Sequence, residues 1–166
     1  MPLTPFHLGP GLFFGLLLFS VIHLPTFLVA NVIIDLEPLF VLLFQLDYPL
    51  HGFFHSLLGG SIIAVALSFI MVRFDERIQK IMRFFKLEQR YSPRSIWFAS
   101  FSGVYIHIIL DSRLYIDIKP FFPLDVNPFY KGSMFAGFET YGFCLVLLIF
   151  GVGLYVYKQL RIKTRF

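Results

Sequence analysis

The sequence contains few charged residues and almost no cysteine. Aspartate, glutamate, lysine and arginine make up 14% of the 166 residues, whereas soluble domains average about 25%. Hydrophobic residues make up 57%, and the mean hydropathy is +0.76. A soluble fold of this length cannot bury so much apolar surface, so the composition excludes a soluble enzyme and predicts an integral membrane protein. The single cysteine, Cys144, excludes a disulfide framework and is expected to be a small buried hydrophobic residue.

Basic residues are missing from the N-terminal part of the chain, because no lysine or arginine precedes Arg73. A cleavable signal peptide needs basic residues before its apolar core, so we expect residues 8–34 to stay in the mature protein. Seven of the 14 lysines and arginines lie in 73–94, and four more lie in 158–165. The positive-inside rule places both stretches, and with them the C-terminus, in the cytoplasm.

Apolar runs long enough for about 20 helical residues predict the membrane spans. Three runs are continuous, at 52–73, 93–111 and 138–158. Two further spans are predicted before them. One begins near Pro5 and ends before Pro25, because proline suits the first turn of a helix but not its interior. The other covers 25–46 and is predicted to be broken near Pro38.

These runs predict an all-α, polytopic membrane bundle of five spans, forming a single integral membrane domain over residues 1–166. The N-terminus and an outer loop at 112–137 would face away from the cytoplasm. Residues 74–92 would form an amphipathic connection along the cytoplasmic surface. Acidic side chains interrupt the basic ones in this segment, which argues against binding to nucleic acid.

The ionisable residues in or near the spans are all histidine, aspartate or glutamate. They are His7, His23, Asp35, Glu37, His51, His55, His107, Asp111 and Glu139. A charged carboxylate at the centre of a bilayer costs about 2.5–3.5 kcal/mol, and no lysine or arginine lies near Asp35 and Glu37 in the sequence. A divalent metal ion would supply the missing positive charge, since imidazole and carboxylate are ligands of first-row metals.

The spacing of these residues supports a shared site. His107 and Asp111 are four residues apart and would lie on one face of a helix, as would His51 and His55 on another helix. Alternatively, that second helix begins at Gly52 and leaves His51 on the preceding loop. We predict that His55, His107, Asp111 and Asp35 bind the metal ion, with His51 and His7 as further candidates.

Other roles for the same residues remain open. The ionisable side chains could form hydrogen bonds between helices or carry protons, without a metal ion. His23 is predicted at the cytoplasmic end of the first helix, where we expect a structural or interfacial role. In the outer loop, Arg113 and Lys119 lie among aromatic residues and could bind an anionic head group, or the loop could be an aromatic interfacial belt.

The order of these motifs resembles a prokaryotic family, the LexA-regulated, YdjM-like membrane-bound metal-dependent hydrolases. The matching positions are His7, Asp35-Leu-Glu37, His51-Gly-Phe-Phe-His55-Ser56 and Val104-Tyr-Ile-His107-Ile-Ile-Leu-Asp111. In the family pattern the paired histidines are five positions apart, and an arginine directly follows the first of them. When the chain is aligned on His55-Ser56, His51 therefore falls at the arginine position, and the glycine that precedes the last histidine is absent.

The resemblance implies a metal-dependent hydrolase in the inner (plasma) membrane. Zinc is the expected metal for this ligand set, although manganese and iron also fit. Glu37 is predicted to act as the general base and Arg113 to bind a head group, with a lipid ester or phosphoester as the substrate in the bilayer. The alternatives are a non-catalytic subunit of a larger membrane complex and an ion transporter; the latter lacks the paired interrupted spans of inverted repeats.

Overall fold

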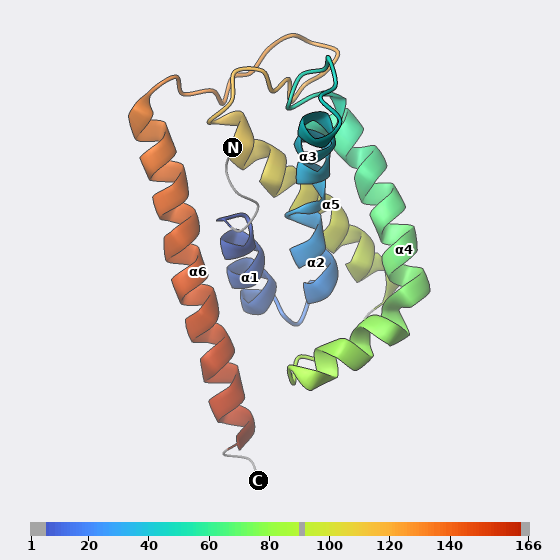
Figure 1. Ribbon diagram of the computed structural model, residues 1–166. Coiled ribbons are helices and arrows are strands. Elements are labelled where there is room, and N and C mark those ends of the chain that lie inside the picture. Colours follow the sequence, from blue (N-terminus) through green and yellow to red (C-terminus); the bar gives the residue numbers. More distant parts are fainter. Residues whose placement is uncertain (1–5, 90–91, 164–166) are drawn as a thin grey trace.

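The computed structural model describes residues 6–89 and 92–163, and all regular elements in these ranges are helical (Figure 1). They are α1 (Leu8–Leu17), α2 (Leu24–Ala30), the short 3-10 helix η2 (Ile33–Asp35), α3 (Leu36–Leu43), the 3-10 helix η3 (Phe53–His55), α4 (Leu57–Phe84), α5 (Pro93–Ser112) and α6 (Met134–Lys163). The prediction of an all-α fold is confirmed for this part of the chain.

Three helical segments are long and apolar enough to cross a membrane. They are Leu24–Leu43, Leu57–Phe84 and Phe135–Arg161. The predicted first span is shorter than expected, because α1 has only 10 residues. Such a helix is about 15 Å long and cannot cross a hydrocarbon core of about 30 Å alone. The chain leaves the helix at Leu18 and turns into α2, which has Pro25 near its start.

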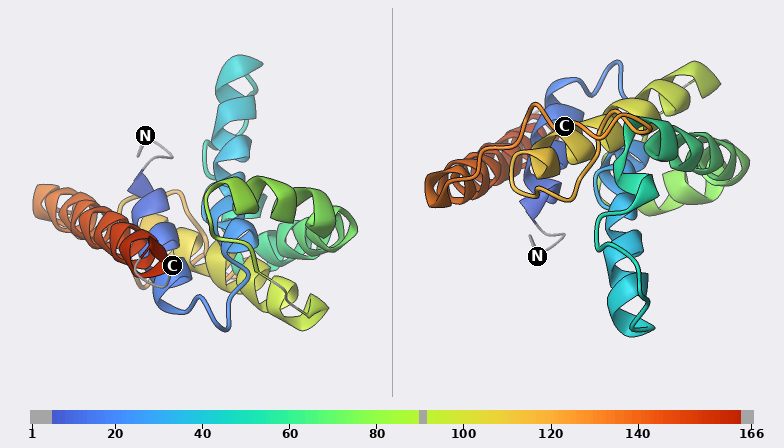
Figure 2. Two further views of the ribbon diagram at one scale, coloured as in Figure 1. Left: turned by 90° about the horizontal axis from the view of Figure 1, so that it is seen from below. Right: turned by 90° about the horizontal axis from the view of Figure 1, so that it is seen from above.

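The segment from α2 to α3 is broken, as predicted, but the predicted position of the break is wrong. α2 ends at Ala30, η2 follows, and α3 then extends sideways from the other helices in both views of Figure 2. Pro38 lies in the first turn of α3, where the missing backbone N–H leaves no hydrogen bond unmade. The break therefore lies at residues 31–35, before the proline.

The start of α4 corrects another prediction. The helix begins at Leu57 rather than Gly52, and Ser56 caps it by accepting a hydrogen bond from Gly59 N at 2.9 Å. His51 lies in the preceding loop and His55 in η3. The two histidines therefore do not share a face of an α-helix.

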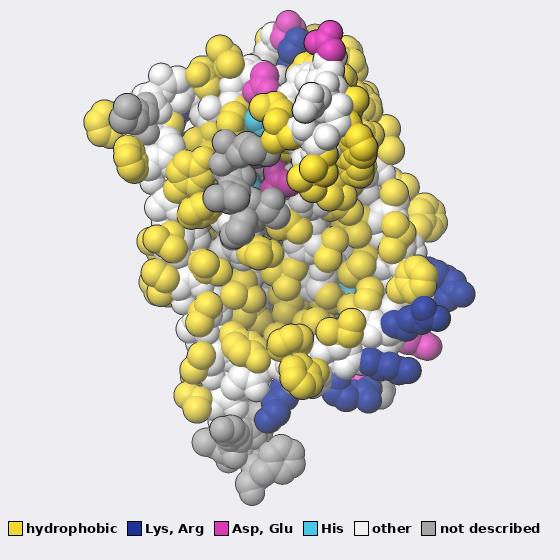
Figure 3. All heavy atoms as spheres, in the orientation of Figure 1, with side chains coloured by type: hydrophobic (Ala, Val, Ile, Leu, Met, Phe, Trp, Pro, Cys, Tyr) yellow, Lys and Arg dark blue, Asp and Glu magenta, His cyan; other side chains and the backbone are white. Residues whose placement is uncertain are grey.

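The far half of α4 and the α5–α6 loop lie at opposite ends of the bundle (Figure 1). α4 remains helical to Phe84, so most of the predicted amphipathic segment is a continuation of α4 that bends beneath the other helices. Arg73, Arg77, Lys80 and Arg83 of this half are exposed. Figure 3 shows basic side chains, in dark blue, gathered at this end of the molecule. The loop between α5 and α6 crosses the other end, where Asn127 Nδ2 donates to Ser112 O at 2.9 Å.

α5 is the central helix that positions the site, since it packs against both α2 and α4. Two glycines allow these close crossings. A Cβ atom on Gly103 would lie 2.5 Å from Ala30 Cβ, and one on Gly60 would lie 2.6 Å from Ile108 Cδ1. The end of α2 and the start of α4 are thereby brought against the same part of α5.

Candidate metal centre

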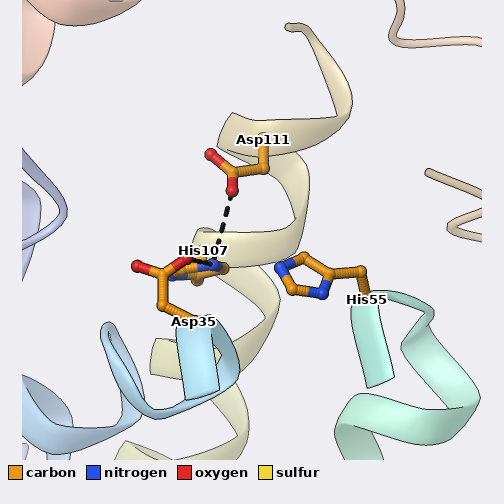
Figure 4. Close-up of side chains that lie close together, drawn as sticks. All are labelled: Asp35, His55, His107 and Asp111. Atoms are coloured by element: carbon orange, nitrogen blue, oxygen red, sulfur yellow. Dashed lines mark ion pairs between the residues drawn. The ribbon is translucent and has the colours of Figure 1, made fainter. Parts of the chain in front are cut away.

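Four ionisable side chains from three chain segments point toward one another beside the end of α5 (Figure 4). They are Asp35 at the end of η2, His55 at the end of η3, and His107 and Asp111 on α5. One ligand atom from each lies within 4.8 Å of the others. The structure thus brings together the four residues that the sequence predicts as the main metal ligands.

Both imidazoles in this cluster are oriented by a hydrogen bond at Nδ1. His107 Nδ1 lies 2.8 Å from Asn31 O, which can only accept, so Nδ1 carries the proton and Nε2 has a free lone pair. His55 Nδ1 likewise forms a hydrogen bond of 2.7 Å with the carboxylate oxygen Glu37 Oε2. Carbonyl and carboxylate groups commonly hold metal-binding histidines in this way. Each Nε2 atom can therefore donate its electron pair toward the centre.

Several ligand atoms of the cluster are buried without a hydrogen-bond partner. Within 6–89 and 92–163, this holds for His55 Nε2, His107 Nε2 and Asp111 Oδ2, whereas Asp111 Oδ1 lies 3.1 Å from His7 Nε2. His107 Nε2 makes only longer ion-pair contacts, at 3.5 Å to Asp35 Oδ1 and to Asp111 Oδ2. An unsatisfied buried polar group costs about 1–3 kcal/mol. A divalent cation would satisfy these atoms together, so the donor set fits a metal ion.

His7 lies beside the cluster, just before α1. It is buried, and its ring stacks on that of His107 with 4.0 Å between the centroids. His7 Nε2 is 3.1 Å from Asp111 Oδ1. His7 can therefore either orient Asp111 or become a further ligand after a small movement.

His51 is near the cluster but faces the outer loop. Its ring centroid is 4.9 Å from that of His55, and its Nδ1 atom lies 3.0 Å from Asp117 Oδ2. Burial is the largest cause that lowers the pKa of His51, and Asp117 only partly opposes this. His51 is thus a neutral partner of Asp117 at neutral pH and lies outside the four-residue group.

The two predicted catalytic side chains also lie outside the four-residue group. Glu37 is behind His55, where its Oε1 atom accepts from Phe54 N at 3.1 Å. Arg113 is at the end of α5, with Nη2 3.2 Å from Glu139 Oε2 of α6. Their catalytic roles stay predictions. Lys119, the other predicted head-group ligand, forms an ion pair with Asp125.

Sequence reasoning missed Asn31 as a part of the site. Its backbone carbonyl orients His107, and its side chain donates to Phe27 O at 2.8 Å. A carbonyl group is common to all residue types, so no motif marks this contact. The available signal was the buried asparagine at the end of a short apolar helix.

Comparisons with known proteins identify the family. A family model described as "YdjM inner membrane protein" matches residues 3–164. No curated protein and no solved structure matches the chain. The family match includes every segment that contributes to the cluster and confirms the resemblance seen in the motifs. The chain belongs to the YdjM family of inner membrane proteins.

Proposed function

We propose that this protein is a membrane-embedded, metal-dependent hydrolase, with a divalent ion bound by Asp35, His55, His107 and Asp111. One observation carries the proposal: buried ligand atoms of these residues lie within 4.8 Å of one another, in an otherwise apolar helical protein. Two imidazoles and two carboxylates suit zinc first, and also manganese or iron.

A divalent metal ion at this position supplies Lewis-acid activation of a water molecule and of the bond to be hydrolysed. Asn31 O and Glu37 hold His107 and His55 in the tautomer that binds metal. Both oxygens of Glu37 already accept hydrogen bonds, from His55 Nδ1 and Phe54 N, so we assign Glu37 to positioning His55 rather than to the role of base.

Of the four proposed ligands, Asp35 is the one most accessible to solvent. Its side chain is 12% exposed, whereas those of His107 and Asp111 are fully buried. His7, with Nε2 3.1 Å from Asp111 Oδ1, holds that carboxylate in place.

The proposed topology has five membrane-embedded helical segments, of which α1 reaches only part of the way across. The basic half of α4 and the end of α6 lie at one end of the molecule, and the α5–α6 loop lies at the other (Figure 1). This separation supports a cytoplasmic C-terminus and a site that faces the extracytoplasmic side. A lipid ester or phosphoester is the substrate class that such a site meets in the bilayer.

Elemental analysis of the purified protein tests the proposal. We expect stoichiometric metal in the wild type, and loss of both metal and phospholipid hydrolysis in His107→Ala. Ser102→Ala is the matched control on α5, because its hydroxyl bonds only to Phe98 O and Ala99 O of its own helix. Absence of bound metal from wild-type protein prepared with excess metal would refute the proposal of a metal-dependent hydrolase. Bound metal without hydrolysis would instead favour a non-catalytic subunit of a larger membrane complex.

A further inference from the structure

An apolar groove runs between α3 and α4, next to the candidate metal centre. Its volume is about 450 Å³, within the usual range of ligand-binding pockets. Its lining includes Ile34, Glu37, Phe40, Val41, Leu46 and Ile63. Among the described residues that line it, Glu37 is the only charged one. The groove therefore suits a hydrocarbon ligand rather than a polar one.

The groove has a buried floor and exposed walls. Ile34 and Val41 are only 1% and 6% exposed, whereas Phe40 and Leu46 are each 51% exposed. The exposed wall belongs to α3 and the segment after it, which extend sideways from the other helices (Figure 2). In an inner membrane protein, an apolar groove that is open at the side of the bundle is accessible to the chains of surrounding lipids.

One end of the groove reaches the candidate site through Glu37. This carboxylate lines the groove and is hydrogen-bonded to His55, a member of the four-residue cluster. Phe40 and Val41 lie about one helical turn further along α3, and Leu46 lies beyond the end of that helix. The groove thus has a polar end beside the cluster and an apolar end away from it.

We propose that the α3–α4 groove binds one acyl chain of a lipid and places the bond next to that chain at the metal centre. This rests on the proposed hydrolase, because it assigns the substrate's orientation at that site. The carbonyl end of the chain lies near Glu37, and the methyl end lies near Leu46. α3 is then the element that selects the lipid by the length and bulk of its chain.

The test is photolabelling of the full-length protein in vesicles of phosphatidylethanolamine and phosphatidylglycerol. Two phospholipid probes are compared, one with a diazirine near the acyl carbonyl and one with a diazirine near the methyl end. We expect the first probe to label residues around Glu37 and Phe54, and the second to label residues around Phe40 and Leu46. Both should label the groove several-fold more than the lipid-facing side of α6 around Val152, which is 48% exposed.

A groove-filling variant gives a second measurement. Val41→Trp puts a large ring into the floor and should reduce groove labelling several-fold. The metal content should be unchanged, because Val41 is not one of the four proposed ligands. Val152→Trp, on the outer side of α6, should change neither quantity. Because the wild-type labelling map needs no variant, the test holds even if Val41→Trp does not fold.

Several outcomes would overturn the proposal. Labelling of the groove no stronger than that of α6, or the same labelled residues for both probes, would show that no oriented chain is held there. Crosslinks from α3 to a second copy of the chain would show that the groove is an interface between copies. Oriented labelling in a protein without metal would instead refute the hydrolase and leave a lipid-binding groove.

Discussion

Two buried histidine clusters, one at each end of the bundle, use similar residues in different ways. At the end that contains the α1–α2 turn, His23 is fully buried, with Nδ1 2.6 Å from Thr26 Oγ1 and Nε2 2.8 Å from Gln79 Nε2. Gln79 Oε1 accepts from Gln89 N at 2.7 Å, and Gln89 Oε1 accepts from Leu24 N at 3.1 Å. Amides thus complete the hydrogen bonds of this cluster.

The cluster around His107 contains no such amide side chains among its ligating groups. His55 Nε2, His107 Nε2 and Asp111 Oδ2 are buried without hydrogen-bond partners, whereas no buried side-chain atom of His23, Gln79 or Gln89 is in that state in the described ranges. Both clusters have a carboxylate near the histidine, since Asp75 Oδ1 lies 3.1 Å from His23 Nε2. A histidine near an acid therefore indicates a metal site only where the neighbouring groups leave the lone pairs unoccupied.

The largest expected difference in bound metal between the two clusters comes from removing one carboxylate charge from each. Asp111→Asn keeps the shape of the side chain but removes a charged ligand, so bound metal should be lost. Asp75→Asn makes the same change near His23 and should leave the metal content unchanged. Metal per chain after dialysis measures both variants. Equal retention in the two variants would show that the clusters do not differ in metal binding.

A smaller effect is expected from Glu37→Gln. The amide can still contact His55 but no longer gives it a carboxylate partner, so metal affinity should fall about 10–100-fold. Competition with a chromophoric chelator measures the affinity. Glu139→Gln is the control, since this 59% exposed carboxylate pairs with Arg113 away from the cluster. An unchanged affinity in Glu37→Gln would mean that Glu37 does not position His55.

The smallest effect on bound metal is expected from Gln89→Leu. This variant should instead lower the free energy of unfolding. This change leaves Leu24 N and the carbonyl group of Phe19 without their side-chain partner. It should destabilise the fold by roughly 1–3 kcal/mol for each buried group left unpaired. Thermal unfolding followed by circular dichroism measures the loss. Gln159→Leu is the control, because it removes a glutamine whose hydrogen bond to Phe85 O lies at the exposed surface. A loss of metal in Gln89→Leu would contradict the separation of the two clusters.

Half of the metal cluster follows directly from the sequence. His107 and Asp111 are four residues apart in an uninterrupted apolar run, and α5 is a regular helix from Pro93 to Ser112. Helical periodicity therefore predicts that both side chains lie on one face. The same reasoning fails for His51 and His55, because the Ser56 cap starts α4 after both of them.

The other half depends on how the chain bends. Asp35 reaches the cluster because the chain breaks at 31–35, earlier than Pro38 indicates. Asn31 O reaches His107 because Gly103 lets α2 approach α5 closely. Both contacts join residues far apart in the sequence. Residue types and spacing therefore predict which groups could bind a metal ion, but not the close helix crossings that assemble them.

The distribution of the ligands along the chain sets the order of events when the protein is made. Asp35 and His55 emerge from the ribosome well before His107 and Asp111. A nascent chain that ends before α5 carries only the first two donors. If the proposed site binds metal, the complete ligand set forms only after translation and membrane insertion of α5, so metal loading would be a late step in the biogenesis of the protein.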